Sequence, residues 1–410
     1  MTEMVTERIF DLDAYVKENE ATVLSCKKSE EKEFEGLFEV VFDSTIFAPE
    51  GGGQASDRGF YGEVRVLDVR EKDGELVHFL EKSVCEGTKD LQKIDFGLRL
   101  RRMQNHNAEH LLCGLIHKKF GYNNVGFHIT ETVSETGDII RETTMDVDGP
   151  LNKEEIRAIE KEANLAIAEN VKIYALLPTK EEAGKIAYRS KLEIDEGLRL
   201  VVIEGYDVCA CCAPCLKSSA EIMCVKILDD MPHRGGMRLT IVAGLDAYED
   251  YSMLHDENRE IMKITSSKRE LCDEAVRLQK DKADEAHESI ILLKKEITEL
   301  YKENLDRHLQ GKQKKKNVFF ADSLDEVQAR TLVNEAVEKK EIILCVMFAK
   351  NESGYRFVAG KNDKISDSLK ELASDMREKI NARGGGSDKM IQGSVTESKE
   401  TISEYFDEME

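Results

Sequence analysis

Apolar and polar residues alternate in short runs along the first part of the chain. The apolar run at 37–42 and the run at 62–69 are typical of β-strands. Glycine-containing segments at 51–53 and 73–74 interrupt the runs as loops. We therefore expect residues 1–95 to form a β-rich domain, shaped as a small barrel or a curved sheet.

The hydrophobic period becomes helical from Arg102 onward. An apolar stripe predicts a helix that ends at Gly121, a typical C-terminal stop, and this stripe comprises Leu111, Leu112, Leu115 and Phe120. A second helix is predicted over 153–169. Strand-like runs follow at 172–178, 198–204, 222–228 and 238–243. We therefore expect an α+β domain over residues 96–245.

A long polar segment without Gly or Pro lies between Leu245 and Gln310. Its apolar residues recur with the three-four spacing of a coiled-coil seam, at Ile290, Leu293, Ile297 and Leu300. A polar helix of this length buries little by itself, so we expect it to pair with a second helix in a hairpin or a dimer. Residues 246–316 are accordingly predicted as a helical, coiled-coil linker.

The last part of the chain alternates again between buried strands and amphipathic helices. Strands are predicted at 318–320 and 342–348, and helices at 325–338 and 366–381. Residues 317–410 are therefore expected to form a small α/β domain, and the chain as a whole belongs to the α+β class. Its most distinctive stretch runs from Arg383 through three consecutive glycines.

Composition narrows the possible functions. The 410 residues are 34% charged, and the net charge of −22 argues against broad binding of nucleic acid, although local basic surfaces remain compatible with it. No run of 18 apolar residues and no secretory signal occurs, so we expect no membrane contact and a cytoplasmic location. Five of the ten cysteines lie between Cys209 and Cys224, which favours metal-bound thiolates over disulfides.

Two histidines have the spacing of metal ligands. His106 and His110 are one helical turn apart, so both imidazoles lie on one face of the predicted helix. Such a pair also occurs by coincidence, with one ring buried and the other exposed. A second signal is therefore needed before the pair indicates a metal site.

The cysteine run supplies this second signal. Four thiols fall within seven residues, at Cys209, Cys211, Cys212 and Cys215, and without a metal they would be an oxidation hazard. Spacing alone leaves the ligands open, because Cys211 and Cys215 are four positions apart whereas Cys209 and Cys212 form a C-x-x-C pair. Mixed nitrogen and sulfur donors favour zinc, and we expect one Zn²⁺ per chain.

A glycine-rich block, Thr45 to Gly59, is the third informative segment. Gly51, Gly52 and Gly53 allow backbone N–H groups to approach a ligand closely. The block lacks the Gly-Lys-Ser/Thr ending of a phosphate-binding loop, so it is not predicted to bind a nucleoside triphosphate. Its polar flanks indicate a ligand-facing loop more than a flexible hairpin tip.

Together these blocks resemble the editing domain of alanyl-tRNA synthetase and its free-standing relatives, the AlaX proteins. The loop from Thr45 to Gln54 is similar to the family's Thr-x-Phe-x-Pro-Glu-Gly-Gly-Gln loop, and His106 to Leu112 matches its His-x-x-x-His-Leu-Leu segment. The cysteine run occupies the place of its Cys-x-x-x-His motif. The C-terminal glycines resemble the signature of the synthetase's C-terminal domain, so the likeness extends over nearly the whole chain, in the manner of a long-form AlaX.

The resemblance implies an aminoacyl-tRNA deacylase, acting on the acceptor end of mischarged tRNA-Ala. Ser-tRNA-Ala is the implied substrate, with Gly-tRNA-Ala as a second candidate. The implied zinc ligands are His106, His110, Cys211 and Cys215, and Cys215 departs from the family, which has His at this place. A full set of four ligands leaves no open position for water, so the resemblance favours a zinc that shapes the pocket over one that generates hydroxide.

Roles for the remaining residues also follow from the resemblance. Thr45 is expected to recognise the serine hydroxyl and Gln54 to position substrate or water, as the catalytic pair. The substrate-binding residues are expected to be Gly51, Gly52, Gly53, Arg102 and Arg383. A homodimer through the coiled coil and the C-terminal domain is expected as well.

Two other functions compete with this interpretation. The chain could be a zinc- and tRNA-binding module with degenerate catalysis, for which Cys215 is the main support. The string from His106 to His110 is also an H-x-x-E-H motif of metallopeptidases, with Glu109 as the general base. A peptidase would leave the glycine loop and the cysteine run unexplained.

Overall fold

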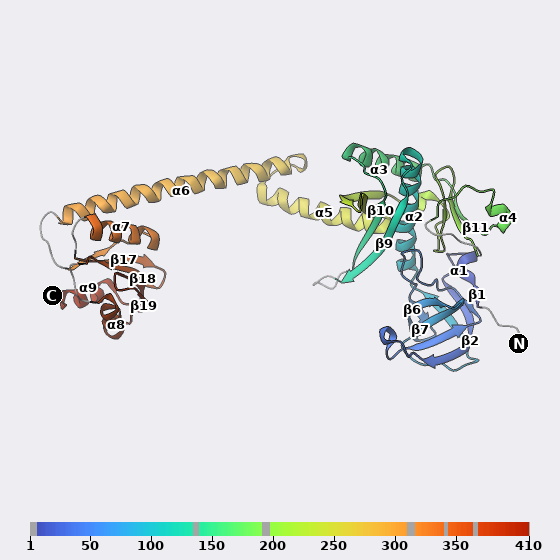
Figure 1. Ribbon diagram of the computed structural model, residues 1–410, viewed down its shortest axis with the longest axis horizontal. Coiled ribbons are helices and arrows are strands. Elements are labelled where there is room, and N and C mark those ends of the chain that lie inside the picture. The colour runs from blue at the N-terminus through green and yellow to red at the C-terminus, as the bar shows by residue number, and fades with distance from the viewer. Residues whose placement is uncertain are drawn as a thin grey trace. The chain divides into compact units, whose positions relative to one another are not determined.

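The computed structural model describes residues 6–133, 139–190, 197–309, 316–339, 343–363 and 368–409. Its elements are labelled in Figure 1. The chain divides into two compact units, Met1–Arg259 and Glu260–Glu410, and we treat each one separately. The finer division into four domains stays a prediction.

The first unit begins with a closed barrel of six strands. In barrel order these are β2 (Glu18–Lys28), β3 (Phe38–Phe42), β7 (Glu75–Leu80), β6 (Val64–Lys72), β5 (Gly59–Tyr61) and β8 (Lys89–Ile94). The runs at 37–42 and 62–69 correspond to β3 and β6. The short strands β1 (Glu7–Arg8) and β4 (Ser44–Thr45) pair beside the barrel, and α1 (Ile9–Leu12) contacts β4. The 3-10 turn η1 (Lys32–Phe34) packs Phe34 against Val41 and Phe79 of the barrel.

Helix α2 (Phe96–Phe120) is the central element of this unit. It begins at Asp95, whose side chain accepts a hydrogen bond from the Leu98 amide, and it ends at Gly121 with φ of 73°. The predicted stop at Gly121 is therefore confirmed, although the helix starts earlier than Arg102. Its middle is buried on all sides, so the helix contributes polar as well as apolar residues to the interior.

Two sheets and a second helix contact α2. A four-stranded sheet has the order β14 (Val225–His233), β15 (Gly236–Ala243), β10 (Ile139–Val147) and β9 (Asn124–Val133). A three-stranded sheet has the order β11 (Ile173–Leu176), β12 (Leu200–Ile203) and β13 (Asp207–Ala210). The other elements are α3 (Lys153–Ala168), α4 (Lys180–Ala183), η2 (Ser219–Ile222) and α5 (Gly244–Thr265). In Figure 1 the β9–β10 pair lies on one side of α2 and β11 on the other.

The helix predicted to run unbroken between Leu245 and Gln310 is interrupted. Helix α5 ends at Thr265, and after the turn η3 (Arg269–Leu271) helix α6 runs over Cys272–Leu309. Hydroxyl side chains explain the break, because they compete for backbone hydrogen bonds. Thr265 Oγ1 donates to the Ile261 carbonyl, 2.7 Å away, and Ser266 has φ of 53°.

The second unit contains a five-stranded sheet in the order β16 (Lys316–Phe320), β17 (Leu344–Asn351), β18 (Gly354–Lys361), β20 (Met390–Val395) and β19 (Arg383–Gly386). Its helices after α6 are α7 (Glu326–Lys339), α8 (Leu369–Ile380) and α9 (Lys399–Asp407). The last turns of α6 bury Leu305 in the same apolar cluster as α7. The mixed α+β class is thus confirmed, and none of the described helices is long and apolar enough to cross a membrane.

Candidate metal and substrate site

The candidate site lies where helix α2 faces strand β13. His106 and His110 stack with ring centroids 4.9 Å apart and an interplanar angle of 8°. Opposite them, Asp207 and Cys209 lie two residues apart on β13, with Cys211 directly after the strand. Side chains two residues apart in an extended segment share one side. The structure therefore presents five potential donors to one small volume.

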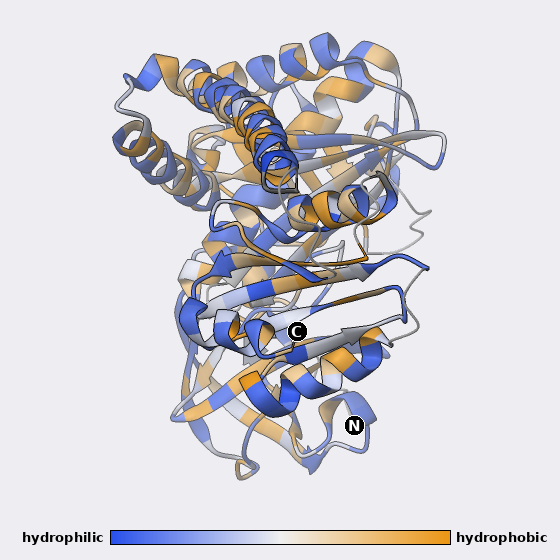
Figure 2. Cartoon of the chain, turned by 90° about the vertical axis from the view of Figure 1, so that its left-hand side faces the viewer, coloured by the Kyte–Doolittle hydropathy of each residue, from blue (hydrophilic) through white to orange (hydrophobic). Residues whose placement is uncertain are grey.

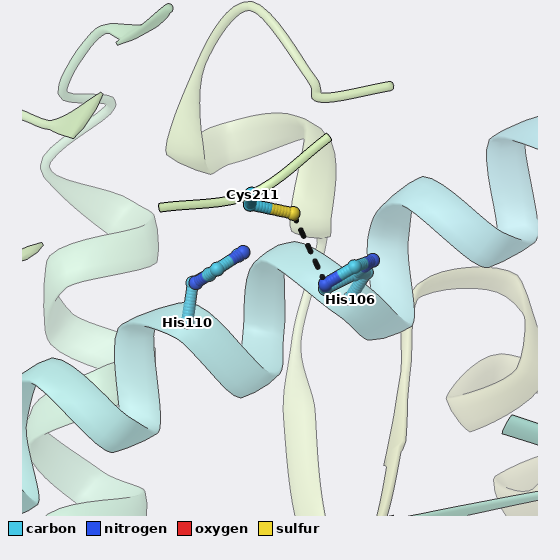
Figure 3. Close-up of side chains that lie close together, drawn as sticks. All are labelled: His106, His110 and Cys211. Carbon is cyan, nitrogen blue, oxygen red and sulfur yellow. Dashed lines mark hydrogen bonds between the residues drawn. The ribbon is translucent and has the colours of Figure 1, made fainter. Parts of the chain in front are cut away.

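A first group of donors consists of His106, His110 and Cys211. Their ligand atoms all lie within 4.8 Å of one another, and His106 Nε2 is 3.6 Å from Cys211 Sγ, as Figure 3 shows. Both ring nitrogens of His110 are buried without a hydrogen-bond partner of good geometry. A buried polar group without a partner is costly. This group therefore fits a metal ion, and its mixed nitrogen and sulfur donors fit zinc.

The ionisation of Cys211 is coupled to that of the neighbouring histidines. Burial alone would raise the pKa of the Cys211 thiol, but the imidazoles of His106 and His110 outweigh it and hold that pKa well below its usual value. Burial would likewise lower the pKa of His110, whereas its contacts with Asp207, Cys209 and Cys211 raise it well above the usual range. The site thus favours a thiolate at Cys211, the form that binds metal.

A second group of donors shares His110 with the first. The ligand atoms of His110, Asp207 and Cys209 also lie within 4.8 Å of one another, and all three residues are buried. However, the Asp207 carboxylate already accepts two hydrogen bonds of 2.7 Å from the Arg189 guanidinium. Since both carboxylate oxygens are engaged in this way, the first group is the better candidate for the metal.

The glycine loop 51–54 closes over the histidines. Gly52 and Gly53 have φ of 63° and 83°, values that favour glycine. A Cβ on Gly52 would lie 3.7 Å from His106 Cε1, and a Cβ on Gly53 would lie 2.2 Å from the Phe127 carbonyl oxygen. The loop therefore needs glycine at position 53 to approach β9. It places Gln54 Oε1 3.0 Å from His106 Nδ1.

A pocket of about 530 Å³ opens beside these residues. This volume is in the usual range for a site that takes a small ligand. Its lining includes Gly52, Gly53, His106, Glu109, His110, Asn124, Phe127, His128, Arg199 and Cys211. Three of the four predicted metal donors, His106, His110 and Cys211, therefore share one cavity with Gly52 and Gly53.

Thr45 and Arg102, predicted as a catalytic and a substrate-binding residue, do not line this pocket. Thr45 is fully buried, with Oγ1 2.8 Å from His78 Nε2 and accepting from the Phe47 amide. Arg102 is also buried and donates two 3.1 Å hydrogen bonds to the Glu131 carboxylate. The structure gives both side chains internal contacts, and their catalytic and substrate-binding roles stay predictions.

Cys215 and Arg383 also lie outside the pocket lining. Cys215 is buried, and its Sγ is 4.0 Å from the Arg199 guanidinium. Burial raises the pKa of the Cys215 thiol, an effect that Arg199 opposes. Cys215 belongs to neither donor group, so its role as the fourth ligand stays a prediction. Arg383 is exposed on β19 of the second unit.

Sequence reasoning missed Asp207, Arg189 and Arg199. Arg199 donates hydrogen bonds to the carbonyls of Cys211 and Ala213, at 3.0 and 2.8 Å, and so holds the cysteine loop. Asp207 had a signal in the sequence, because it precedes Cys209 by two positions in a strand-like run. Arg189 and Arg199 had none, since only the fold brings them to the loop.

Known proteins similar to this chain include alanyl-tRNA editing proteins and alanine–tRNA ligases. The alanyl-tRNA editing protein AlaX-L of Pyrococcus horikoshii is 26% identical over 422 aligned positions, which cover 97% of this chain and 96% of that protein. An alanine–tRNA ligase of Ignicoccus hospitalis is 32% identical over 65% of this chain. The alanyl-tRNA editing protein Aarsd1-B of Xenopus laevis is 31% identical over 53% of this chain.

Coverage of these relatives differs widely. The chain spans only 29% of the Ignicoccus ligase and 53% of the Xenopus protein. No family model matches the chain. Among solved structures, the C-Ala domain of Aquifex aeolicus alanyl-tRNA synthetase matches 22% of this chain at 18% identity with a TM-score of 0.20, a score too low to support a structural conclusion.

Proposed function

We infer that this chain, a member of the AlaX family of free-standing alanyl-tRNA editing proteins, is an aminoacyl-tRNA deacylase that hydrolyses the ester of mischarged tRNA-Ala. Ser-tRNA-Ala is its main substrate and Gly-tRNA-Ala a second one. One observation carries the proposal. Two stacked imidazoles and a thiol meet a glycine loop at the wall of a pocket of about 530 Å³.

The metal of this site is one Zn²⁺ per chain. His106, His110 and Cys211 would hold it, which fits the unpartnered nitrogens of His110 and the thiolate character of Cys211. Zinc bound there would act as a Lewis acid toward the substrate carbonyl. The chain's own residues would shape the pocket around the ion, because the Phe127 ring lies 4.6 Å from the His106 ring and Gly52 brings no side chain to the histidines.

Selectivity for serine over alanine would come from a polar group of the pocket that alanine leaves unpaired. A pocket that hydrogen-bonds the serine hydroxyl rejects alanine, because its own polar group would otherwise be left unsatisfied. Since Thr45 lies outside the pocket lining, the side chains available for this hydroxyl include Glu109, Asn124 and His128. The Glu109 carboxylate already accepts a hydrogen bond from Asn124 Nδ2, which keeps it from moving freely.

The second unit would contribute to tRNA binding through its own exposed surface. Arg383 and the glycines after it form the exposed strand β19, at one edge of the five-stranded sheet. Glycines leave the backbone open to a phosphate chain, and a single arginine adds a charge contact. Arg383→Ala should therefore raise KM for charged tRNA and flatten its salt dependence, with kcat unchanged.

Dimerisation through α6 is proposed on its exposed apolar residues. Ile290, Leu293 and Leu300 are 51%, 56% and 59% exposed, and they follow the predicted seam. Figure 2 shows hydrophobic residues interspersed with hydrophilic ones along the helices. Sedimentation of the full chain, compared with an Ile290→Glu/Leu293→Glu variant, tests this proposal.

Deacylation of purified Ser-tRNA-Ala and Ala-tRNA-Ala is the deciding experiment. The proposal expects rapid release of serine and slow release of alanine, and it expects His106→Ala to abolish the former. Equal rates, or no hydrolysis while tRNA still binds, would favour the binding module with degenerate catalysis. Thr45→Val is expected to leave the Ser/Ala ratio unchanged, because its hydroxyl contacts His78.

A further inference from the structure

Each imidazole of the donor group has a side-chain oxygen near its Nδ1. His106 Nδ1 lies 3.0 Å from Gln54 Oε1. His110 Nδ1 makes no hydrogen bond of good geometry, and Asp207 Oδ2 lies 3.5 Å from it. The two oxygens come from different parts of the fold, the loop after β4 and strand β13.

A neutral imidazole has one N–H and one lone pair, and only the lone pair binds a metal. An oxygen acceptor at Nδ1 favours the tautomer with the proton on Nδ1, which leaves the lone pair on Nε2. For His106, Nε2 is the atom 3.6 Å from Cys211 Sγ. Figure 3 shows the His110 ring likewise directing one end toward Cys211.

Asp207 is itself held in place. Arg189 Nε donates to its Oδ1 and Arg189 Nη2 donates to its Oδ2, both at 2.7 Å, and the two side chains are only 14% and 3% exposed. A bidentate contact of this kind fixes the plane of the carboxylate. Gly114, one turn beyond His110 on α2, lets this part of β13 come close to the helix, since a Cβ there would lie 2.8 Å from Asp207 Cβ.

We propose that Gln54 and Asp207 are positioning residues for the metal centre. Gln54 orients His106, and Asp207, locked by Arg189, orients His110, so that both Nε2 atoms face a single thiophilic divalent cation together with Cys211. The inference deepens the proposed function and rests on its metal site. In this assignment Gln54 contacts His106 and not the substrate, and Asp207 contacts His110 and not the metal.

Binding of Zn²⁺ and Co²⁺ to the full chain tests this without any tRNA. Gln54→Met removes the acceptor at similar size, and Asp207→Asn leaves only one oxygen for both His110 and Arg189. Each should weaken Zn²⁺ binding, measured against a chromophoric chelator, by about 10- to 100-fold. Each should still reach one ion per chain at saturation, but with altered Co²⁺ absorption bands.

Two controls separate positioning from general damage to the fold. Gln54→Glu keeps an oxygen acceptor and should restore affinity to within a few-fold of the parent chain. Asp229→Asn makes the same chemical change as Asp207→Asn at an exposed position on β14. It should leave the Zn²⁺ affinity and the Co²⁺ spectrum as in the parent chain. A merely structural role would lower thermal stability in Gln54→Met and Asp207→Asn while the affinity and the Co²⁺ spectrum stayed as in the parent.

Two results would overturn the inference: parent-like affinity and spectra in both test variants, or no binding of either ion by the parent chain. The proposed function is judged separately. If the variants lose affinity as expected but the zinc-loaded parent leaves Ser-tRNA-Ala intact, the deacylase assignment fails and the positioning roles stand.

Discussion

Gly114→Ala is the substitution that most directly examines the contact between helix α2 and strand β13. Gly114 is eight residues after His106 and four after His110 and so lies on the same face of the helix. A Cβ at this position would lie 2.6 Å from the Tyr206 carbonyl oxygen and 2.8 Å from Asp207 Cβ. Both distances are well inside van der Waals contact, and one involves backbone that cannot rotate away.

Two effects of opposite sign set the expected magnitude. Alanine in place of glycine inside a helix stabilises it by about 1 kcal/mol. Overpacking against a fixed neighbour costs about 1–3 kcal/mol. The net change in the free energy of unfolding is therefore a loss of at most about 2 kcal/mol. The larger effect should fall on the metal centre, because the strand that must move carries Asp207 and leads into Cys211.

We expect Gly114→Ala to weaken Zn²⁺ binding by at least about tenfold, in line with the cost of disturbing groups around metal ligands. Gly97→Ala is the matched control in the same helix, since its Cβ would meet nothing closer than Asp95 Oδ1 at 3.4 Å. It should bind Zn²⁺ as the parent does and be equally or slightly more stable. Chelator competition and urea unfolding measure the two quantities. Parent-like Zn²⁺ affinity in Gly114→Ala would show that the helix–strand separation does not constrain the site.

Four further substitutions probe the surroundings of the site. Gly52→Ala should lower the free energy of unfolding by about 1–2 kcal/mol because of its positive φ. Gly53→Ala should lower it distinctly more, because its Cβ would meet a β9 carbonyl 2.2 Å away. Equal hydrogen-exchange protection of the loop in the two variants would contradict this. Asp57→Asn leaves Arg99, a fully buried residue of α2, without its carboxylate partner. It should lower the free energy of unfolding by about 3–5 kcal/mol. A loss below about 1 kcal/mol would show that the pair is not desolvated. The hydrogen bond from Arg238 lowers the pKa of Asp146. The stabilisation by this bond is therefore present above the pKa of the carboxyl in the unfolded chain, and it is lost as the pH falls through the pKa in the folded chain. Asp146→Asn should be less stable than the parent at pH 7, and the difference in stability should close below about pH 4.

The sequence predicted the elements whose type and ends follow from a local pattern of residues. Helix α2 has an apolar stripe and a glycine stop, and both its type and its C-terminal end were correct. Strands β9 and β10 were not predicted, although Val125, Phe127 and Ile129 alternate with less apolar residues along β9. Their missing prediction matters here, since β9 supplies Phe127 and one wall of the pocket.

The histidine pair was predicted from its spacing and Cys211 from the family resemblance, and the structure brings the three together. Spacing reports which side chains share a face of one element, but it does not report what lies opposite that face. Thr45 illustrates the difference. Its place beside the glycine loop suggested contact with substrate, yet β4 directs the hydroxyl inward to His78, a partner 33 residues away.

The position of the site on α2 also has a physical consequence. Polar residues in the middle of this helix are buried, and three of them hold different segments. Gln104 donates to the Glu221 carbonyl, while the side-chain oxygens of Asn105 and Asn107 accept from the amides of Ala243 and Leu216. A helix fixed by neighbours on every side changes its orientation only if several of these bonds break together. Ligands that project from it therefore keep their spacing while the cysteine loop adjusts, so a substitution in α2 should disturb metal binding more than one of equal size in the loop.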